Sequence, residues 1–310
     1  MKFLVKFLVV FCIVSFATSC KDSPKTIVEK KIIKPLTNSV AQVKAKPLSM
    51  EFKSYWYNNE AEITSYKLDQ ARYGEMRSGT AVLVYVTEPF LRDLQVKADK
   101  NYPTNIPVLK LNAIKKFNTG IYPYSIMQST FYPVANNEHA LKVSCSVQEW
   151  CGHVYTQLNN RIDFEVMSHS YFENEADEDF NLEKTILENE LWIQLRINPK
   201  SLPVGDQQII PSLEFLRLRH VPLKGYQAKA QLTNDSYSVS YPELNRSLTI
   251  HFNPEFPYDI NGWEETFMSG FGQAAKQLTT KATKIATIKS DYWNKNSNAD
   301  DGSRKTLGLN

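Results

Sequence analysis

Residues 152–171 read GHVYTQLNNRIDFEVMSHSY, and this stretch decides the predicted fold. Apolar and polar side chains alternate in residues 152–158 and again in residues 162–171, which is the period-two pattern of half-buried strands. Asn159 and Asn160 separate the two runs, and asparagine tolerates the positive φ of a tight hairpin turn. The stretch therefore predicts a β-hairpin.

Runs of the same kind recur along most of the chain. They occupy residues 62–68, 80–87, 108–115, 121–131, 140–147, 213–219, 226–232, 236–241, 247–252 and 278–288. Residues 180–190 differ, because their leucine and isoleucine side chains have helical spacing, and residues 191–197 alternate again as a strand. The chain is therefore expected to be mainly β, with a large antiparallel curved sheet or open half-barrel and one or two helices. β and α segments do not alternate regularly, which argues against a doubly wound nucleotide-binding fold.

The first twenty residues, MKFLVKFLVVFCIVSFATSC, have the layout of a secretory signal. The apolar run of residues 7–16 is too short for a bilayer-spanning helix, which needs roughly 20 residues. Small residues and Cys20 follow, and this junction resembles the lipobox of bacterial lipoproteins, although Ala17 stands where leucine is commonest. We expect cleavage before Cys20 and a diacylglycerol with an N-acyl chain such as palmitate on that cysteine. An ordinary signal peptide that leaves a free Cys20 thiol is the alternative.

These features divide the chain into four parts. Residues 1–19 are the expected lipoprotein signal peptide, and residues 20–49 are the lipidated cysteine and a flexible tether with seven lysines and no aromatic residue. Residues 50–295 form the antiparallel β domain, and the polar residues 296–310 are expected to be a disordered tail. More than one acyl chain anchors a protein stably. We therefore expect a lipid-anchored protein on the periplasmic face of the outer membrane, with the cell surface as an alternative.

Charge argues against a nucleic-acid partner. The net charge of +3 comes from the signal and the tether, and acidic residues slightly outnumber basic ones in the rest of the chain. No concentrated basic face is visible there. The expected partners are the membrane through the lipid anchor, and a lipid-like ligand or an envelope protein through the β domain. Aromatic clusters such as Tyr55-Trp56-Tyr57 either pack in the core or line an apolar ligand cavity.

One short stretch combines several reactive side chains. On a single strand, Glu149, Cys151, His153 and Tyr155 would point to one face. They could supply a nucleophilic Cys–His pair for an envelope hydrolase or transferase, part of a metal site, or only a polar row with Cys151 packed as a small apolar side chain. No second Cys–His cluster completes a site, and the common hydrolase and nucleotide signatures are absent. We expect no cofactor and no metal, and a binding protein more than an enzyme.

Two further features stay open. On one straight strand, Cys145 and Cys151 would lie roughly 20 Å apart, beyond the ~7 Å limit for a disulfide, so they can pair only if residues 147–149 turn. The acidic residues 173–179 could hold calcium, but they lack the regular spacing of a calcium loop. A solvated loop that precedes a helix is the favoured interpretation of the acidic stretch.

Three stretches carry a family resemblance: SYKLDQARYGE at residues 65–75, FNTGIYPYS at residues 117–125 and QEWCGH at residues 148–153. They resemble a family of uncharacterised Gram-negative lipoproteins, some of which are labelled septum formation inhibitor Maf. True Maf nucleotide pyrophosphatases open with a phosphate-binding S-x-S-x-R loop, and no such loop begins this body, so the motifs do not support that label. More loosely, a strand-rich body on a tether is similar to the half-barrels of lipoprotein carriers. This likeness is one of fold alone.

Overall fold

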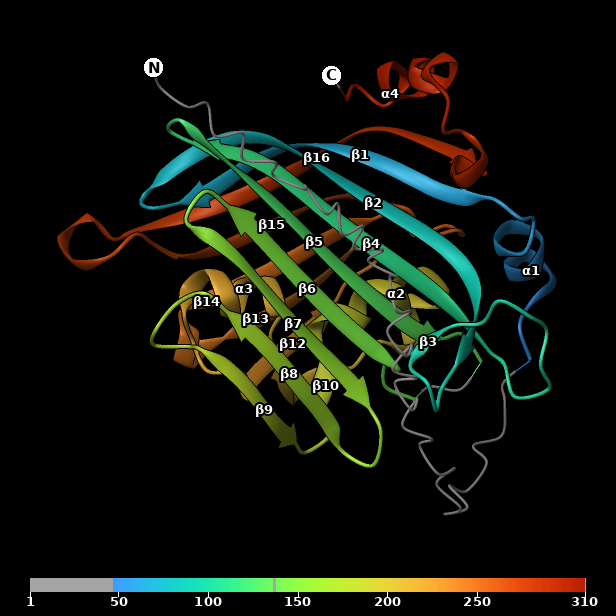
Figure 1. Cartoon of the computed structure of the whole chain (residues 1–310), viewed down its shortest axis with the longest axis horizontal. Coiled ribbons are helices and arrows are strands. Elements are labelled where there is room, and N and C mark those ends of the chain that lie inside the picture. Colours follow the sequence, from blue (N-terminus) through green and yellow to red (C-terminus); the bar gives the residue numbers. More distant parts are fainter. Residues whose placement is uncertain (1–46, 136–137, 310) are drawn as a thin grey trace, which may run out of the picture. The chain divides into compact units, whose positions relative to one another are not determined.

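The computed structural model describes residues 47–135 and 138–309. The signal peptide, Cys20 and most of the expected tether therefore lie outside the described residues. Within these ranges sixteen strands form one sheet (Figure 1). The strands are β1 (Ala61–Arg72), β2 (Glu75–Leu91), β3 (Val96–Lys97), β4 (Ile106–Thr119), β5 (Tyr122–Pro133), β6 (Lys142–Glu149), β7 (Gly152–Asn160), β8 (Phe164–Ser170), β9 (Asp177–Leu182), β10 (Ile186–Leu187), β11 (Gly205–Ile210), β12 (Tyr226–Leu232), β13 (Ser236–Tyr241), β14 (Arg246–Phe252), β15 (Ile260–Ser269) and β16 (Lys276–Ser290). The four α-helices of the described residues are α1 (Met50–Trp56), α2 (Glu188–Ile197), α3 (Leu213–Arg219) and α4 (Gly302–Thr306).

The sheet is curved and does not close. Its strands follow the order β10-β11-β12-β13-β14-β15-β16-β1-β2-β4-β5-β6-β7-β8-β9, with β3 paired to β2 outside this path. All pairs are antiparallel except β10 with β11. β9 and β10 form the two open edges. The predicted fold class, a large curved antiparallel sheet in a mainly β protein, is confirmed.

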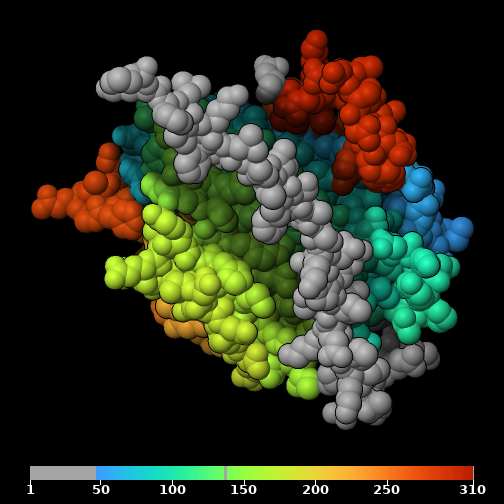
Figure 2. Space-filling model, in the orientation of Figure 1, coloured from blue at the N-terminus to red at the C-terminus, as the bar shows by residue number. Residues whose placement is uncertain are grey.

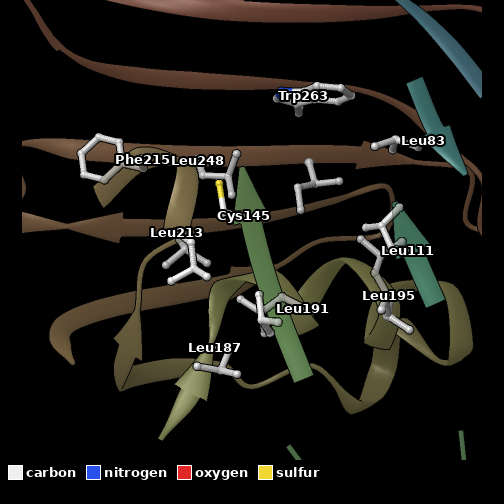
Figure 3. Close-up of a cluster of buried hydrophobic side chains, with 14 of the residues drawn as sticks. Leu83, Leu111, Cys145, Leu187, Leu191, Leu195, Leu213, Phe215, Leu248 and Trp263 are labelled. Atoms are coloured by element: carbon white, nitrogen blue, oxygen red, sulfur yellow. The ribbon is translucent and has the colours of Figure 1, made fainter. Parts of the chain in front are cut away.

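Helices α2 and α3 lie within the curve of the sheet and fill it. Figure 3 shows their side chains between strands that come from both halves of the strand order. The residues that meet there are Leu191 and Leu195 from α2, Leu213 and Phe215 from α3, and Leu83, Leu111, Cys145, Leu248 and Trp263 from the strands. The concave face is therefore a packed core whose burial stabilises the fold.

Buried ion pairs tie each internal helix to a distant strand. Arg246 of β14 binds Glu188 of α2, with its Nη2 2.7 Å from Glu188 Oε1. Lys115 Nζ of β4 lies 2.9 Å from Glu214 Oε1 of α3. Arg246 Nε also donates to Glu265 of β15 at 2.7 Å. A charge inside a protein is costly unless it is paired, so these contacts fix where the two helices sit.

Two segments that were expected to be strands are helices. Residues 191–197 belong to α2 and residues 213–219 form α3, whereas the helix expected over residues 180–190 is mostly strand β9, a connection and strand β10. α2 is surrounded by sheet, so it buries polar Glu188, Asn189 and Arg196 together with its leucines. A helix buried on most of its surface lacks the one-sided apolar stripe that sequence reasoning looks for.

The expected hairpin between residues 152 and 171 exists, but its turn is shifted. Asn159 and Asn160 belong to β7 and pair with Glu165 and Phe164. The turn follows at residues 161–163, where Arg161 N donates to Asp163 O at 2.9 Å. The Asn160 side chain is held at the sheet end because its Nδ2 donates to Ala140 O at 3.1 Å.

Residues 296–309 include regular secondary structure, whereas a disordered tail was expected there. Residues 298–306 form a 3₁₀ turn, Asn298–Asp301, followed by α4. Leu307 is only 5% exposed, because it packs with Ala61, Ile63 and Val86 of the first two strands. Figure 2 shows these C-terminal residues in red. No helix in the described part of the chain is long and apolar enough to cross a membrane.

Candidate ligand-binding groove

The residues Glu149, Cys151 and His153 do not form the expected row on one strand. Glu149 ends β6 and pairs with Gly152, which begins β7, so Trp150 and Cys151 form the two-residue turn between them. Gly152 has a φ of +156°, and a Cβ at that position would lie 3.0 Å from the Tyr171 ring. His153 lies on β7 opposite Gln148. The single-strand expectation was wrong because the chain reverses at this point.

The turn does not prepare Cys151 as a nucleophile. Its side chain is exposed rather than packed. A hydrogen bond from the thiol to the Glu149 carboxylate, together with the negative charge of that carboxylate, raises the pKa of Cys151. Thiolate formation is thus disfavoured. Within residues 47–135 and 138–309, no hydrogen bond joins Cys151 to His153.

The remaining candidates also separate in space. Cys145 faces the core, and both Cys145 and Cys151 are free, so the two are not bridged. Burial raises the pKa of the Cys145 thiol. The acidic residues of the 173–179 stretch do not converge, since Asp177 to Asp179 lie on β9 and Glu175 pairs with Arg217. No group of three or more His, Cys, Asp or Glu side chains that could hold a metal ion occurs among the described residues.

The interior offers little free space. The cavity between α2, α3 and the sheet has a volume of about 40 Å³ and is lined by Lys115, Glu214, Arg246 and Glu265 among others. One water needs about 10–15 Å³ of such volume, so this cavity holds a few waters at most. An apolar ligand therefore does not fit in this central cavity.

A much larger groove of about 870 Å³ lies between α3 and strands β7 to β9. About half of its lining residues are apolar, and these include Val154, Phe180, Leu213, Leu216, Val221, Leu223 and Phe271. Thr156, Ser168, Asn174 and Glu178 are also in the lining. Three further polar groups of the groove converge, since Glu175 Oε1 lies 2.8 Å from Arg217 Nη1 and 2.6 Å from His220 Nδ1. Apolar walls with a few converging polar groups are the usual composition of a small-molecule site.

α3 positions the polar side of the groove. Ser212 caps its N-terminus by accepting a hydrogen bond from Phe215 N, and His220 ends it in a left-handed conformation with a φ of 52°. Arg217 therefore projects from the last turn, where its guanidinium lies 4.5 Å from the centre of the Phe172 ring. Sequence reasoning missed Arg217 and His220 because this segment was expected to be a strand. The serine before an apolar run that ends in arginines is the signal that could have identified the helix.

Beside the groove lies a smaller cavity of about 70 Å³. It shares Val154, Arg217 and His220 with the groove, and it adds Arg72, Tyr73 and Tyr124 to the lining. Glu149 and Cys151 lie on its wall as well. The sequence-predicted residues are thus at the margin of the candidate site and not at its centre.

Exposed apolar side chains occupy the turns at this end of the sheet. Because neighbouring strands are antiparallel, the turns of β1–β2, β4–β5, β6–β7, β8–β9 and β15–β16 lie at one end (Figure 1). We call the tips of these five turns the hairpin rim, defined by Tyr73, Ile121, Trp150, Tyr171 and Phe271. Ile121 is 84% exposed, Tyr171 72% and Trp150 68%. The orange β15–β16 hairpin stands out from the surface in Figure 2.

Comparison with known proteins finds distant similarity to solved structures. No protein-family model matches the chain, and no curated protein matches it in sequence. A beta-barrel-like protein of the domain of unknown function DUF1849 from Brucella abortus is 6% identical, with 74% of this chain and 98% of that chain covered and a TM-score of 0.43. A porin-like protein from Bacteroides uniformis is 7% identical, with 72% and 95% covered and a TM-score of 0.21.

Proposed function

We propose that this protein is a lipoprotein, anchored through acylated Cys20 to the periplasmic face of the outer membrane, whose β domain binds an amphipathic ligand. The ligand lies in the groove between α3 and strands β7 to β9. The observation that carries this proposal is the groove itself, because a groove of about 870 Å³ that has both apolar and polar walls, with Arg217 and His220 on one side, suits a molecule with an apolar body and a polar end.

The anchor is tested by metabolic labelling. An alkynyl fatty acid should label the wild-type protein, and Cys20→Ala should abolish the label because that variant has no thiol for the diacylglycerol. Ser19→Ala is the matched control, since it leaves the thiol in place and should still be labelled. Equal labelling of the wild type and Cys20→Ala would refute lipidation at this residue.

The groove is tested by blocking it. Native mass spectrometry of the full chain extracted from membranes should detect a bound amphiphile. Val221→Trp places a large side chain on the groove wall and should remove that adduct. Val204→Trp is the control, because Val204 is exposed and lies outside the groove lining. Absence of any adduct in the wild type, or an unchanged adduct in Val221→Trp, would contradict ligand binding at this groove.

A second candidate is a protein partner of the envelope, and the hairpin rim is the observation that favours it. Exposed aromatic and aliphatic side chains on neighbouring turns are unusual on a free surface and are typical of binding surfaces. Trp150→Ser and Ile121→Ser together should weaken capture of a cross-linked partner in cells. The ligand adduct should remain, because neither residue lines the groove.

A further inference from the structure

Arg72 is a buried arginine that has no carboxylate partner among the described residues. It is 7% exposed, and the other two buried arginines in the described residues, Arg196 and Arg246, each bind a glutamate. Arg72 instead donates to neutral oxygens: Leu218 O at 2.6 Å, Tyr73 Oη at 3.0 Å and Tyr124 Oη at 3.1 Å. Its Nε has no hydrogen-bond partner among the described residues. A buried charge is normally paired, so this cation calls for a counter-ion.

A second guanidinium lies near Arg72. Arg219 and Arg72 line the same small space at the end of β1, together with Glu214 and Glu265. Burial lowers the pKa of Arg219, and the positive charge of Arg72 lowers it further. No ion pair joins Arg219 to a carboxylate within residues 47–135 and 138–309. Two like charges held side by side attract an anion more strongly than either does alone.

The acidic residues nearby do not cancel this charge. Glu175 is engaged by Arg217 and His220. The Glu149 carboxylate accepts a hydrogen bond from Cys151 N at 2.8 Å in the β6–β7 turn. Glu214 and Glu265, which line the space shared by Arg72 and Arg219, pair with Lys115 and Arg246. Among the described residues, no carboxylate of these linings forms an ion pair with Arg72.

The space beside Arg72 fits an oxyanion. The cavity of about 70 Å³ is several times the roughly 10–15 Å³ that one water needs. It adjoins the apolar groove through Val154, Arg217 and His220. An oxyanion in the cavity would accept hydrogen bonds from a guanidinium and from phenol hydroxyls. Hydrogen bonds of this kind are strong when one partner is charged.

We infer that Arg72, with Arg219 beside it, binds the anionic headgroup of an amphiphile whose apolar chain lies in the groove. The ligands of this class have in common a phosphate or carboxylate oxyanion attached to an alkyl chain. This inference rests on the proposed ligand-binding function and names the class of its ligand. Arg72 also holds the end of α3 by donating a hydrogen bond to Leu218 O. The test therefore needs a readout that a purely structural role would not change.

That readout is selectivity for charge. The full chain with Cys20→Ala, purified without detergent, is titrated with decyl phosphate, decanol and inorganic phosphate by isothermal titration calorimetry. Decyl phosphate should bind at least about ten-fold more tightly than decanol. Arg72→Gln should remove this preference, and Arg72→Lys should retain part of it. Arg161→Gln is the matched control, because Arg161 pairs with Glu165 at the opposite end of β7 and should leave the preference unchanged.

Arg219→Gln keeps the test decisive if Arg72→Gln fails to fold. Arg219 is only partly buried, and its variant should reduce the preference for decyl phosphate several-fold with a normal circular dichroism spectrum. Equal binding of decyl phosphate and decanol would overturn the headgroup site and leave the proposed function intact. Inorganic phosphate that binds as tightly as decyl phosphate would overturn the assignment of a lipid. Failure of both alkyl probes to bind would overturn the inference and the proposed function together.

Discussion

Arg196 of α2 and Glu62 of β1 form a bidentate ion pair across 134 positions of sequence, with Nη1–Oε1 and Nη2–Oε2 distances of 2.5 and 2.7 Å. Both side chains are 1% exposed. The Tyr55 hydroxyl donates to the same carboxylate, and the rings of Trp56 and Tyr85 lie 5.0 and 4.8 Å from the guanidinium. The pair therefore joins the first helix, the first strand and the internal helix at one point.

Removal of one member of this pair should be strongly destabilising. Arg196→Met leaves Glu62 buried without its counter-ion, which typically costs about 3–5 kcal/mol. The double variant Glu62→Leu with Arg196→Met should lose less than the sum of the single variants, because no uncompensated charge remains. Urea unfolding measures the loss of unfolding free energy in the single variants and in the double variant. Lys224→Met is the control, since its ion pair with Glu243 is exposed and contributes about 0–1 kcal/mol. Additive losses would contradict direct coupling.

The acid sensitivity of the fold should depend on Glu188. Burial raises the pKa of this carboxyl, but the Arg246 guanidinium and its hydrogen bonds outweigh burial and hold the pKa below the ordinary value of 4.5. The corresponding stability is present above pH 4.5 and is lost as the pH falls through the lower folded pKa. Glu188→Gln should be less stable than the wild type at pH 7 and should show a shallower loss of unfolding free energy below pH 4.5.

Glu214→Gln provides the contrast in that experiment. Burial raises the pKa of Glu214 despite its contact with Lys115. A raised carboxyl pKa stabilises the fold at low pH, and the contribution is lost as the pH rises through the folded pKa. Glu214→Gln should therefore leave the loss below pH 4.5 unchanged. Identical pH profiles for Glu188→Gln and the wild type would refute the role of Glu188.

Cys151 should react slowly with iodoacetamide at neutral pH although it is exposed. The Glu149 carboxylate raises the pKa of the thiol and so reduces the thiolate fraction. Glu149→Gln should accelerate alkylation, and His153→Ala should not change it. The rate relative to N-acetylcysteine, followed by mass spectrometry, checks this. Rapid modification that depends on His153 would instead favour the hydrolase or transferase alternative.

The β domain should fold without the preceding segment. Ser49 caps α1 by accepting a hydrogen bond from Phe52 N at 3.0 Å, and Leu48 packs against the core. A fragment of residues 47–310 should therefore show a cooperative thermal transition and a β-type circular dichroism spectrum. Ser49→Ala in that fragment should cost about 1 kcal/mol, the usual contribution of an N-cap. A disordered spectrum for residues 47–310 would refute independent folding.

Strand periodicity alone predicted much of the sheet. Residues 226–232 and 236–241 were expected as strands and are strands β12 and β13 with the same bounds. β15 was missed, because its sequence, INGWEETFMS, carries two glutamates that break the apolar run. Glu265 of this strand faces inward to Arg246, and a buried glutamate is recognised as core only when its partner is known.

The sequence by itself determined the alternation of apolar and polar side chains, and hence a large antiparallel sheet, because that pattern is local and has a period of two residues. Only the tertiary structure decided what fills the curve of the sheet and where the groove lies. α2 and α3 carry charges whose partners, such as Glu62 for Arg196 and Lys115 for Glu214, come from strands about a hundred or more residues away. The Arg72 cavity likewise combines β1 with residues near the end of α3. Such long-range pairing depends on how the sheet curves, and no local pattern in the sequence records it.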